Sequence, residues 1–247
     1  FADMLAKLKL PYDSIETREL TKNLFTFINF YSKVESVNLS RERGSFRKYN
    51  DSLCGQENWY NRFRKNKNEW VSDIDWQALI NGIQKYGIRN SSTTAVPPTG
   101  RSASIVNASY SIEPYFTLYD SSSPTGLNTI LIDYIRNRYS KNEQEEIIKT
   151  VLKTGDCSQL DDRFKEVKEI YKTAKEINAK DHIEVMAIIN SCIDESISKT
   201  VNLPNKTSVE QIQNYILQAY NKGLNGITFF RDRCLEERNI DMEEKER

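Results

Sequence analysis

The sequence predicts a helix-rich α/β protein, with long helices packed outside a sheet or barrel of short strands. Long stretches carry apolar residues at spacings of three and four, which is typical of helices. Between them lie short stretches rich in Ser, Thr, Val and Phe, near residues 88–96, 197–202 and 226–231. At 247 residues, of which 38% are hydrophobic, the chain is long enough for one large domain or two modest ones.

The first strong helical pattern covers residues 14–41. Its apolar residues recur at helical spacing, and we expect them to form one face; they are Leu20, Leu24, Phe27, Ile28, Tyr31, Val34 and Val37. Asp13 or Ser14 can supply the N-cap, and Gly44 follows the last turn. The simplest role for Phe25, Phe27, Phe30 and Tyr31 is core packing.

The next stretch is expected to leave the helical core. Residues 45–72 are polar and aromatic, which favours a surface excursion with a short helix near residues 59–65. A second helix is predicted over residues 75–86, with Asp73 or Asp75 as its cap.

From Ile88 the helical period is lost, and the sequence predicts a strand up to Val96 that two prolines end. A turn-rich segment, SSSPTG, precedes the second half of the chain. The elements predicted there are helices at 127–138, 142–153, 161–177 and 181–195, a strand at 197–202, a helix capped by Thr207 or Ser208 that runs to about Lys222, and a buried strand at 226–231 that includes Phe229 and Phe230.

Composition limits the classes of function. Lys plus Arg equals Asp plus Glu at 35 each, so no basic surface for nucleic acid or membrane is indicated. No apolar run approaches the ~18 residues that span a bilayer. The four cysteines form no CxxC pair or zinc spacing, which indicates a reducing, cytoplasmic setting with structural thiols and no metal site.

One segment has the composition of an anion site. Residues 96–114 read VPPTGRSASIVNASYSIEP. In a strand–loop–helix arrangement, Gly100 would let an anion approach the main chain, Thr99, Ser102 and Ser104 would add hydroxyls, and Arg101 would add a charge. The segment does not fit the Walker pattern. From the residues alone, an ordinary polar loop and a phosphate cradle both remain open.

His182 is the only histidine. It lies near the start of a predicted helix, so we expect a solvated side chain close to the helix cap. No nucleophile motif or partner spacing supports a Ser-His-Asp or Cys-His enzyme.

Four stretches together resemble the C-terminal half of the large catalytic subunit of ribonucleotide reductases. They are FADMLAKLKLPYDS, GIRNSSTTAVPPTGRSASIVNASYSIEPYF, CIDESISKTVNLP and AYNKGLNGITFFRD, in the order that the family has. The resemblance implies that residues 1–233 form the second half of a ten-stranded α/β barrel, followed by a charged, frayed tail at 234–247. It also implies a loop that holds the substrate phosphates, formed by Pro98, Thr99, Gly100, Arg101 and Ser102. Arg101 departs from the family pattern, which has Ser or Thr there.

Within the family, SISKTVNLP and GITFFRD are most similar to the adenosylcobalamin-dependent, class II branch. Phe229 and Phe230 stand where other classes have adjacent tyrosines that pass a radical inward. The family's Asn-Pro-Cys-Gly-Glu-like loop, with its thiyl-radical cysteine, is not in this sequence, and no catalytic residue is assigned. The chain also starts on a helix-like pattern at Phe1, which indicates a cut end or a processed product.

The resemblance therefore implies part of a reductase that converts ribonucleoside di- or triphosphates to deoxyribonucleotides by thiyl-radical chemistry. Such a chain would need an N-terminal half as partner, and the complete enzyme could form a homodimer. The alternative is a non-catalytic nucleotide-binding or interaction protein that reuses the half-barrel.

Overall fold

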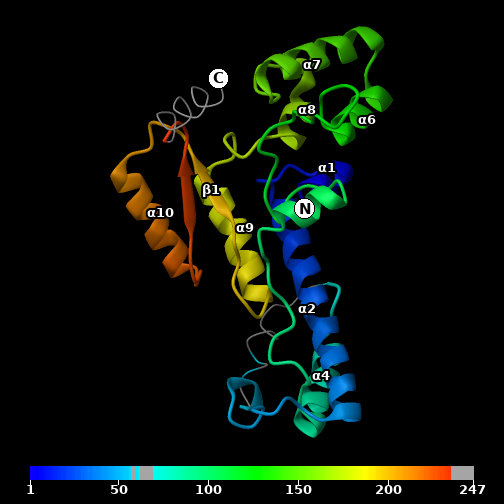
Figure 1. The fold of residues 1–247 in the computed structure, drawn as a ribbon, viewed down its shortest axis with the longest axis vertical. Helices are drawn as coiled ribbons and strands as arrows, with labels where there is room; N and C mark the ends of the chain where they lie inside the picture. Colours follow the sequence, from blue (N-terminus) through cyan, green and yellow to red (C-terminus); the bar gives the residue numbers. More distant parts are fainter. Residues whose placement is uncertain (57–58, 60, 62–68, 235–247) are drawn as a thin grey trace, which may run out of the picture.

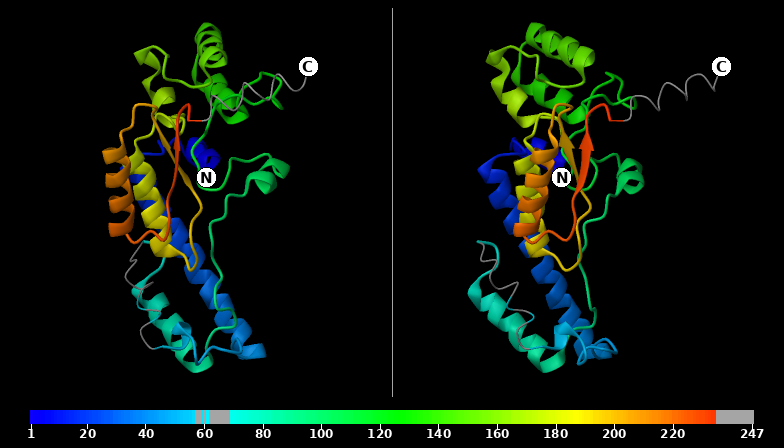
Figure 2. Two further views of the ribbon diagram at one scale, coloured as in Figure 1. Left: turned by 60° about the vertical axis from the view of Figure 1, so that its left-hand side comes forward. Right: turned by 90° about the vertical axis from the view of Figure 1, so that its left-hand side faces the viewer.

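A computed structural model describes residues 1–56, 59, 61 and 69–234 of the chain. The arrangement is elongated, and the 29-residue helix α2 (Ile15–Arg43) lies along its long direction (Figure 1). Helix α9 (Ala179–Cys192) lies along the first half of α2, and α4 (Asp73–Tyr86) packs beside the second half. Helices α6 (Thr129–Arg138), α7 (Lys141–Thr154) and α8 (Lys165–Ile170) form a cluster at the opposite end from α4 (Figures 1 and 2).

Helix α2 begins as predicted but buries a different face. Ser14 is its N-cap, and the Ser14 hydroxyl accepts a hydrogen bond from the Thr17 amide at 3.0 Å. Phe30 and Val37 are buried, whereas Phe27, Ile28 and Tyr31 are exposed; the buried polar residues of the helix are Thr17, Thr21, Thr26, Asn29, Lys33, Ser36 and Ser40. The expectation of one apolar buried face is therefore wrong for Phe27, Ile28 and Tyr31, whereas Phe30 and Val37 are buried as expected. The polar face is buried because its side chains find hydrogen-bond partners on α9 and on residues 86–93.

Helix α4 also has a different cap from the one predicted. Ser72 is the N-cap, and the Asp75 carboxylate accepts a hydrogen bond from the Ser72 amide at 3.0 Å, which completes a capping box. The short helix expected near residues 59–65 falls mostly outside the described residues. The tail at 234–247 is outside them except for Cys234.

The predicted strand at 88–96 is not a regular strand. Only Val96 makes a ladder contact, an isolated parallel bridge to Ile197. The backbone amides of Thr93 and Thr94 donate instead to the Asp194 carboxylate, at 2.7 and 3.2 Å. A side chain thus takes the place that a neighbouring strand would have in a ladder.

The helix predicted over 161–177 is interrupted after Ile170. The Glu176 carboxylate accepts hydrogen bonds from the Thr173 amide and hydroxyl, both at 2.7 Å, and the Ala174 amide donates to the Tyr115 carbonyl, also at 2.7 Å. These contacts compete with helical hydrogen bonds and turn the chain toward residue 115. The apolar stripe of this segment is nevertheless buried as expected; it comprises Phe164, Val167, Ile170, Tyr171 and Ala174.

The C-terminal region forms a β–α–β unit. Strands β1 (Thr200–Leu203) and β2 (Thr228–Arg231) are parallel and are connected by α10 (Val209–Asn221), which Ser208 caps. One face of this sheet packs on α9 and α10 through Val201, Leu203 and Phe229. The opposite face is open, and Phe230 on it is 42% exposed, so the prediction of a buried strand is wrong for β2. The helix-rich α/β class is confirmed.

Gly155 is a position where the fold requires glycine. It follows α7 with φ +76°, and a Cβ atom there would lie 2.8 Å from the Tyr119 ring and 2.9 Å from the Thr117 hydroxyl. We expect Gly155→Ala to lower the free energy of unfolding by about 1–3 kcal/mol, measured by urea denaturation, because it adds both backbone strain and a close contact. Gly226→Ala is the matched control, since nothing lies within 4 Å of its Cβ position. Equal stability of the two variants would contradict this account.

Candidate functional site

The loop singled out by composition leads into a short helix, α5 (Gly100–Ile105). The first amide with a helical acceptor is that of Ala103, which donates to the Thr99 carbonyl at 2.8 Å. The amides of Gly100, Arg101 and Ser102 therefore make up the open N-terminal end of the turn, where unpaired N–H groups favour an anion. Nothing lies within 4 Å of the Gly100 Cβ position, and Arg101 and Ser102 are exposed. The start of α5 therefore lies at the surface of the described part of the chain.

Thr99 gives the loop its shape. It has the left-handed backbone conformation, with φ 53°, which a threonine rarely adopts. The Thr99 hydroxyl oxygen accepts a hydrogen bond from the Ser111 amide at 2.8 Å. This contact closes the segment from 99 to 111 into a loop, with the Ile-Glu-Pro motif directly after it.

A buried ion pair holds the segment that precedes the loop in place. The Lys33 ammonium on α2 pairs with the Asp194 carboxylate, and both side chains are almost fully buried. Asp194 also accepts from the amides of Thr93 and Thr94, while Lys33 donates to the Thr93 hydroxyl at 2.6 Å. The segment that enters the loop is thereby held between α2 and the end of α9.

A second buried ion pair holds the segment that follows the loop in place. Glu113, from the Ile-Glu-Pro motif, lies 2.7 Å from the Lys199 ammonium. The other oxygen of Glu113 accepts from the Thr200 amide at 2.8 Å. Burial lowers the pKa of Lys199, and the neighbouring carboxylate opposes that shift. Both flanks of the loop are therefore tied to the region of α9 and β1.

His182 is buried, contrary to the expectation of a solvated side chain. Its Nδ1 lies 2.8 Å from the Lys199 ammonium and its Nε2 lies 3.0 Å from the Ala174 carbonyl. Because the ammonium is a donor and the carbonyl an acceptor, the ring is neutral with its proton on Nε2. Burial and then the Lys199 charge lower the pKa of His182 to about 3. His182 is a structural hydrogen-bonding residue here.

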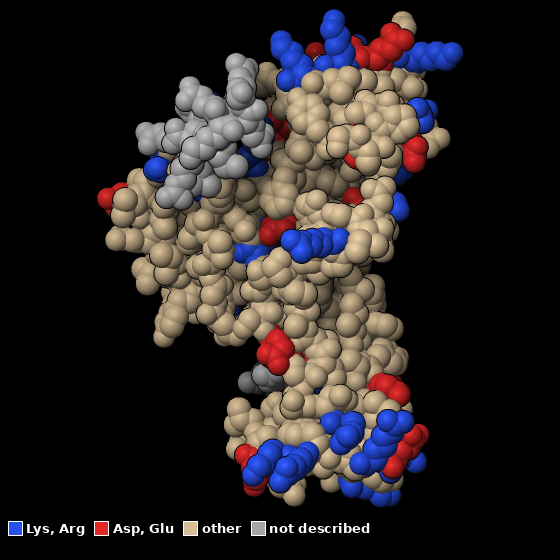
Figure 3. Space-filling model, in the orientation of Figure 1, with Lys and Arg blue, Asp and Glu red and all other residues tan. Residues whose placement is uncertain are grey.

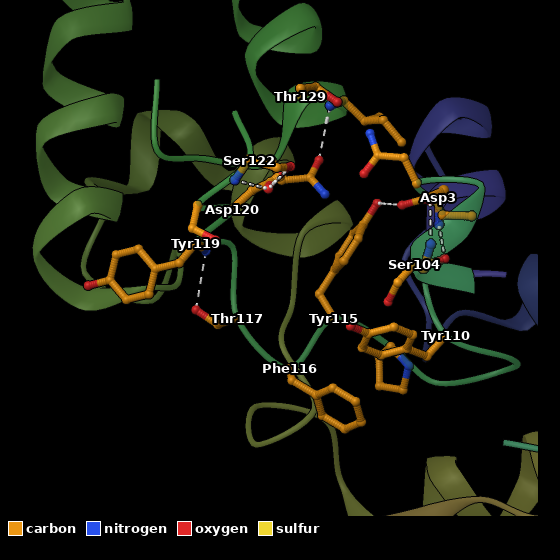
Figure 4. Close-up of a pocket in the computed structure, with 17 residues that line it drawn as sticks. Asp3, Ser104, Tyr110, Tyr115, Phe116, Thr117, Tyr119, Asp120, Ser122 and Thr129 are labelled. Carbon is orange, nitrogen blue, oxygen red and sulfur yellow. Dashed lines mark hydrogen bonds between the residues drawn. The ribbon is translucent and has the colours of Figure 1, made fainter. Parts of the chain in front are cut away.

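A pocket of about 450 Å³ lies beside α5 (Figure 4). Tyr115 lies in its wall with its hydroxyl donating to Asp3 at 2.8 Å, and the rings of Tyr110 and Phe116 lie 6.3 Å apart. Asp3 and Asp120 are the charged residues in its lining, which contains no Lys or Arg. A pocket with this charge is unsuited to phosphate, so the loop at the start of α5 remains the candidate anion site. The sequence analysis did not identify this pocket, because its residues come from separate stretches of chain.

Comparison with known proteins assigns the family. Residues 1–230 match the family described as "Ribonucleotide reductase, barrel domain". The chain belongs to this ribonucleotide reductase family. The resemblance inferred from the four sequence stretches is confirmed.

Two curated reductases and one solved structure illustrate the similarity. A vitamin B12-dependent ribonucleoside-diphosphate reductase of Thermoplasma acidophilum is 31% identical over 94% of this chain, and the large subunit of the mimivirus enzyme is 29% identical over 90%. The chain spans about a quarter of their lengths, 27% and 26%. The class Id reductase alpha subunit of Actinobacillus ureae shares the fold, with a TM-score of 0.70 and 20% identity over 95% of this chain and 38% of that subunit.

The reductase barrel domain thus brings together the predicted loop residues Pro98, Thr99, Gly100, Arg101 and Ser102 in one exposed turn. The sequence analysis missed the two ion pairs that hold this turn, although Asp194 and Lys199 lie within a stretch that carried the resemblance. Within the described residues, no cluster of His, Cys, Asp and Glu could bind a metal ion. The described helices also include none that is long and apolar enough to cross a membrane.

Proposed function

We propose that this chain is the C-terminal half of a ribonucleotide reductase catalytic barrel, comprising residues 1–233, and that it holds the phosphates of a ribonucleoside diphosphate. The observation that carries the proposal is the exposed turn at 98–102, with open amides and hydroxyls, in a chain of the reductase family. The diphosphate is favoured because the similar proteins named above are diphosphate reductases.

The turn supplies binding groups of three kinds. The amides of Gly100, Arg101 and Ser102 lie at the start of α5, and the Thr99 hydroxyl, which accepts from Ser111, keeps its own hydrogen for a phosphate oxygen. The Ser102 hydroxyl donates to the Thr99 carbonyl at 3.3 Å and would exchange this contact for a phosphate oxygen. The Arg101 guanidinium adds a positive charge in an exposed position, where it can close over the phosphates. These groups bind and orient the substrate, and we assign none of them to bond breaking.

The surface around the turn supports an N-terminal half as partner. Charged side chains gather at the two ends of the face seen in Figure 3, whereas few lie on its middle part. One face of the β1–β2 sheet is also open, and Phe230 on it is exposed. An open sheet face is typical of a surface that another part of a barrel covers.

We propose adenosylcobalamin as the cofactor of the complete enzyme, because the similar protein of Thermoplasma acidophilum carries "vitamin B12-dependent" in its name. This chain supplies no imidazole ligand for the cobalt, since both ring nitrogens of its only histidine, His182, are occupied by buried hydrogen bonds. The complete enzyme would hold the cofactor, and the partner half would carry the radical cysteine. The cytoplasm is the proposed location, in keeping with cysteines that form no disulfide among the described residues, namely Cys54, Cys157, Cys192 and Cys234.

The first test is nucleotide binding. We expect the chain to bind CDP and inorganic pyrophosphate in isothermal titration, and Gly100→Ala to weaken both about tenfold, equivalent to about 1.4 kcal/mol, by filling the space in front of the amides. The fold tolerates this change because nothing lies within 4 Å of the Gly100 Cβ position. Gly226→Ala, which is equally unhindered, is the control. Binding that Gly100→Ala leaves unchanged would reject the phosphate loop.

The second test is reductase turnover with adenosylcobalamin and a dithiol. The chain alone is expected to be inactive, and addition of a separately encoded N-terminal chain with the Asn-Pro-Cys-Gly-Glu loop is expected to restore turnover. Substantial activity of the chain alone would refute the split-enzyme proposal. Nucleotide binding without rescue by any N-terminal chain would instead support a non-catalytic nucleotide-binding protein.

A further inference from the structure

We propose that Lys199 is a positioning residue for the phosphate loop: through Glu113 it sets the shape of the turn at 98–102 without touching the nucleotide. The choice of ligand rests on the proposed function. The positioning itself rests on contacts between residues that lie far apart in the sequence.

Lys199 uses all three hydrogens of its ammonium group. They are directed to the Glu113 carboxylate at 2.7 Å, to Nδ1 of His182 at 2.8 Å and to the Thr200 carbonyl at 2.9 Å. The Lys199 side chain is completely buried. Three acceptors arranged around one buried ammonium fix its position and, in turn, fix the carboxylate that faces it.

Glu113 transmits this position to the main chain. Its carboxylate is held at two points, by Lys199 and by the Thr200 amide at 2.8 Å. The next residue upstream, Ile112, is buried, and its carbonyl accepts a hydrogen bond from the Tyr12 hydroxyl at 2.8 Å. The backbone of residues 111–113 therefore has little freedom to shift.

The constrained backbone reaches the loop through a single hydrogen bond. The Ser111 amide donates to the Thr99 hydroxyl at 2.8 Å. The other hydrogen bonds of residues 98–102 in the described part of the chain stay within the turn and α5. The Ser111–Thr99 bond is the one that joins the turn to a segment outside them. Since Thr99 has an uncommon backbone conformation, we infer that loss of this contact lets the turn relax and spreads the amides that face the phosphate.

The test combines ligand affinity with the exchange of one amide. In Lys199→Met, which removes the charge but keeps the length of the side chain, we expect the Kd for inorganic pyrophosphate to rise at least tenfold. We also expect hydrogen exchange of the Ser111 amide to accelerate at least tenfold, with the amides of α7 unchanged. Ile147→Ala is the control, because Ile147 is fully buried in the α6–α8 cluster; it should lower stability and leave pyrophosphate affinity unchanged.

Unchanged pyrophosphate affinity in a folded Lys199→Met chain would overturn the inference. If that variant does not fold, Glu113→Gln is measured in its place with the same two criteria, because it keeps the shape and one acceptor of the side chain. If the unsubstituted chain binds no pyrophosphate, the proposed function fails. The exchange of the Ser111 amide then decides the positioning alone, and an unchanged rate overturns it.

Discussion

Asp194→Ala is expected to lower the free energy of unfolding by about 3–5 kcal/mol, the range for removing one partner of a buried ion pair. The substitution leaves the Lys33 ammonium in a nearly fully buried site without its carboxylate. It also removes the acceptor of the amides of Thr93 and Thr94, residues that lead into the proposed phosphate loop. Urea denaturation followed by circular dichroism measures the change.

Two further variants make the Asp194 experiment specific. Asp162→Ala removes a pair to Lys168 in which the Asp162 side chain is 99% exposed, and we expect a change below about 1 kcal/mol. The double variant Lys33→Met, Asp194→Leu replaces both charges by apolar groups and should recover much of the lost stability, because no unpaired charge remains buried. An Asp194→Ala effect no larger than that of Asp162→Ala would contradict the assignment.

Acidification is expected to destabilise the chain through His182. The pKa of His182 is about 3 in the folded chain, against about 6.5 for an unfolded histidine. Between these two values the unfolded chain binds more protons, so stability falls as the pH is lowered through this window. Between pH 7.5 and pH 4 the expected loss is about 3 kcal/mol, measured as urea denaturation at a series of pH values.

His182→Gln is the control for the pH experiment, because glutamine keeps an acceptor and a donor but does not titrate. It should flatten the dependence of stability on pH between about 6.5 and 4. Protonation of Asp194 contributes little to the pH dependence in this range. Burial raises the pKa of this carboxyl, but Lys33 and the Thr93 hydrogen bonds outweigh burial and hold it below its usual range. A slope that is the same in His182→Gln as in the unsubstituted chain would show that another group is responsible.

Local signals in the sequence were sufficient for much of the fold. Helices α7 and α10 begin where Ser140 and Ser208 form capping boxes, and the sequence placed both helices within one or two residues. The turn at 98–102 could be singled out as a candidate because its small and hydroxylated residues lie next to one another. Its function as a phosphate site stays a prediction that the binding experiments test.

The burial of certain side chains could not be predicted from the sequence, for one physical reason. The burial of Lys33, His182 and Lys199 depends on acceptors that lie elsewhere in the chain, such as Glu113, 86 residues from Lys199. A hydropathy pattern treats such residues as exposed, because it contains no information about distant partners. For the same reason the pattern places Phe27, Ile28 and Tyr31 of α2 in the core, whereas the side of the helix that is buried is largely polar and hydrogen-bonded.

The free edge of β2 has a consequence for how the protein has to be made. In the described part of the chain, β2 pairs with β1 alone, so one row of its backbone groups is available to any extended strand, and the exposed Phe230 lies beside it. A second copy of the chain can compete for this edge with the proposed partner. Such competition grows with concentration, so yield in the soluble fraction should rise with co-expression of the proposed partner and with a slow rate of synthesis. The same strand edge that would pair with the proposed partner would thus also be an aggregation hazard while the chain is alone.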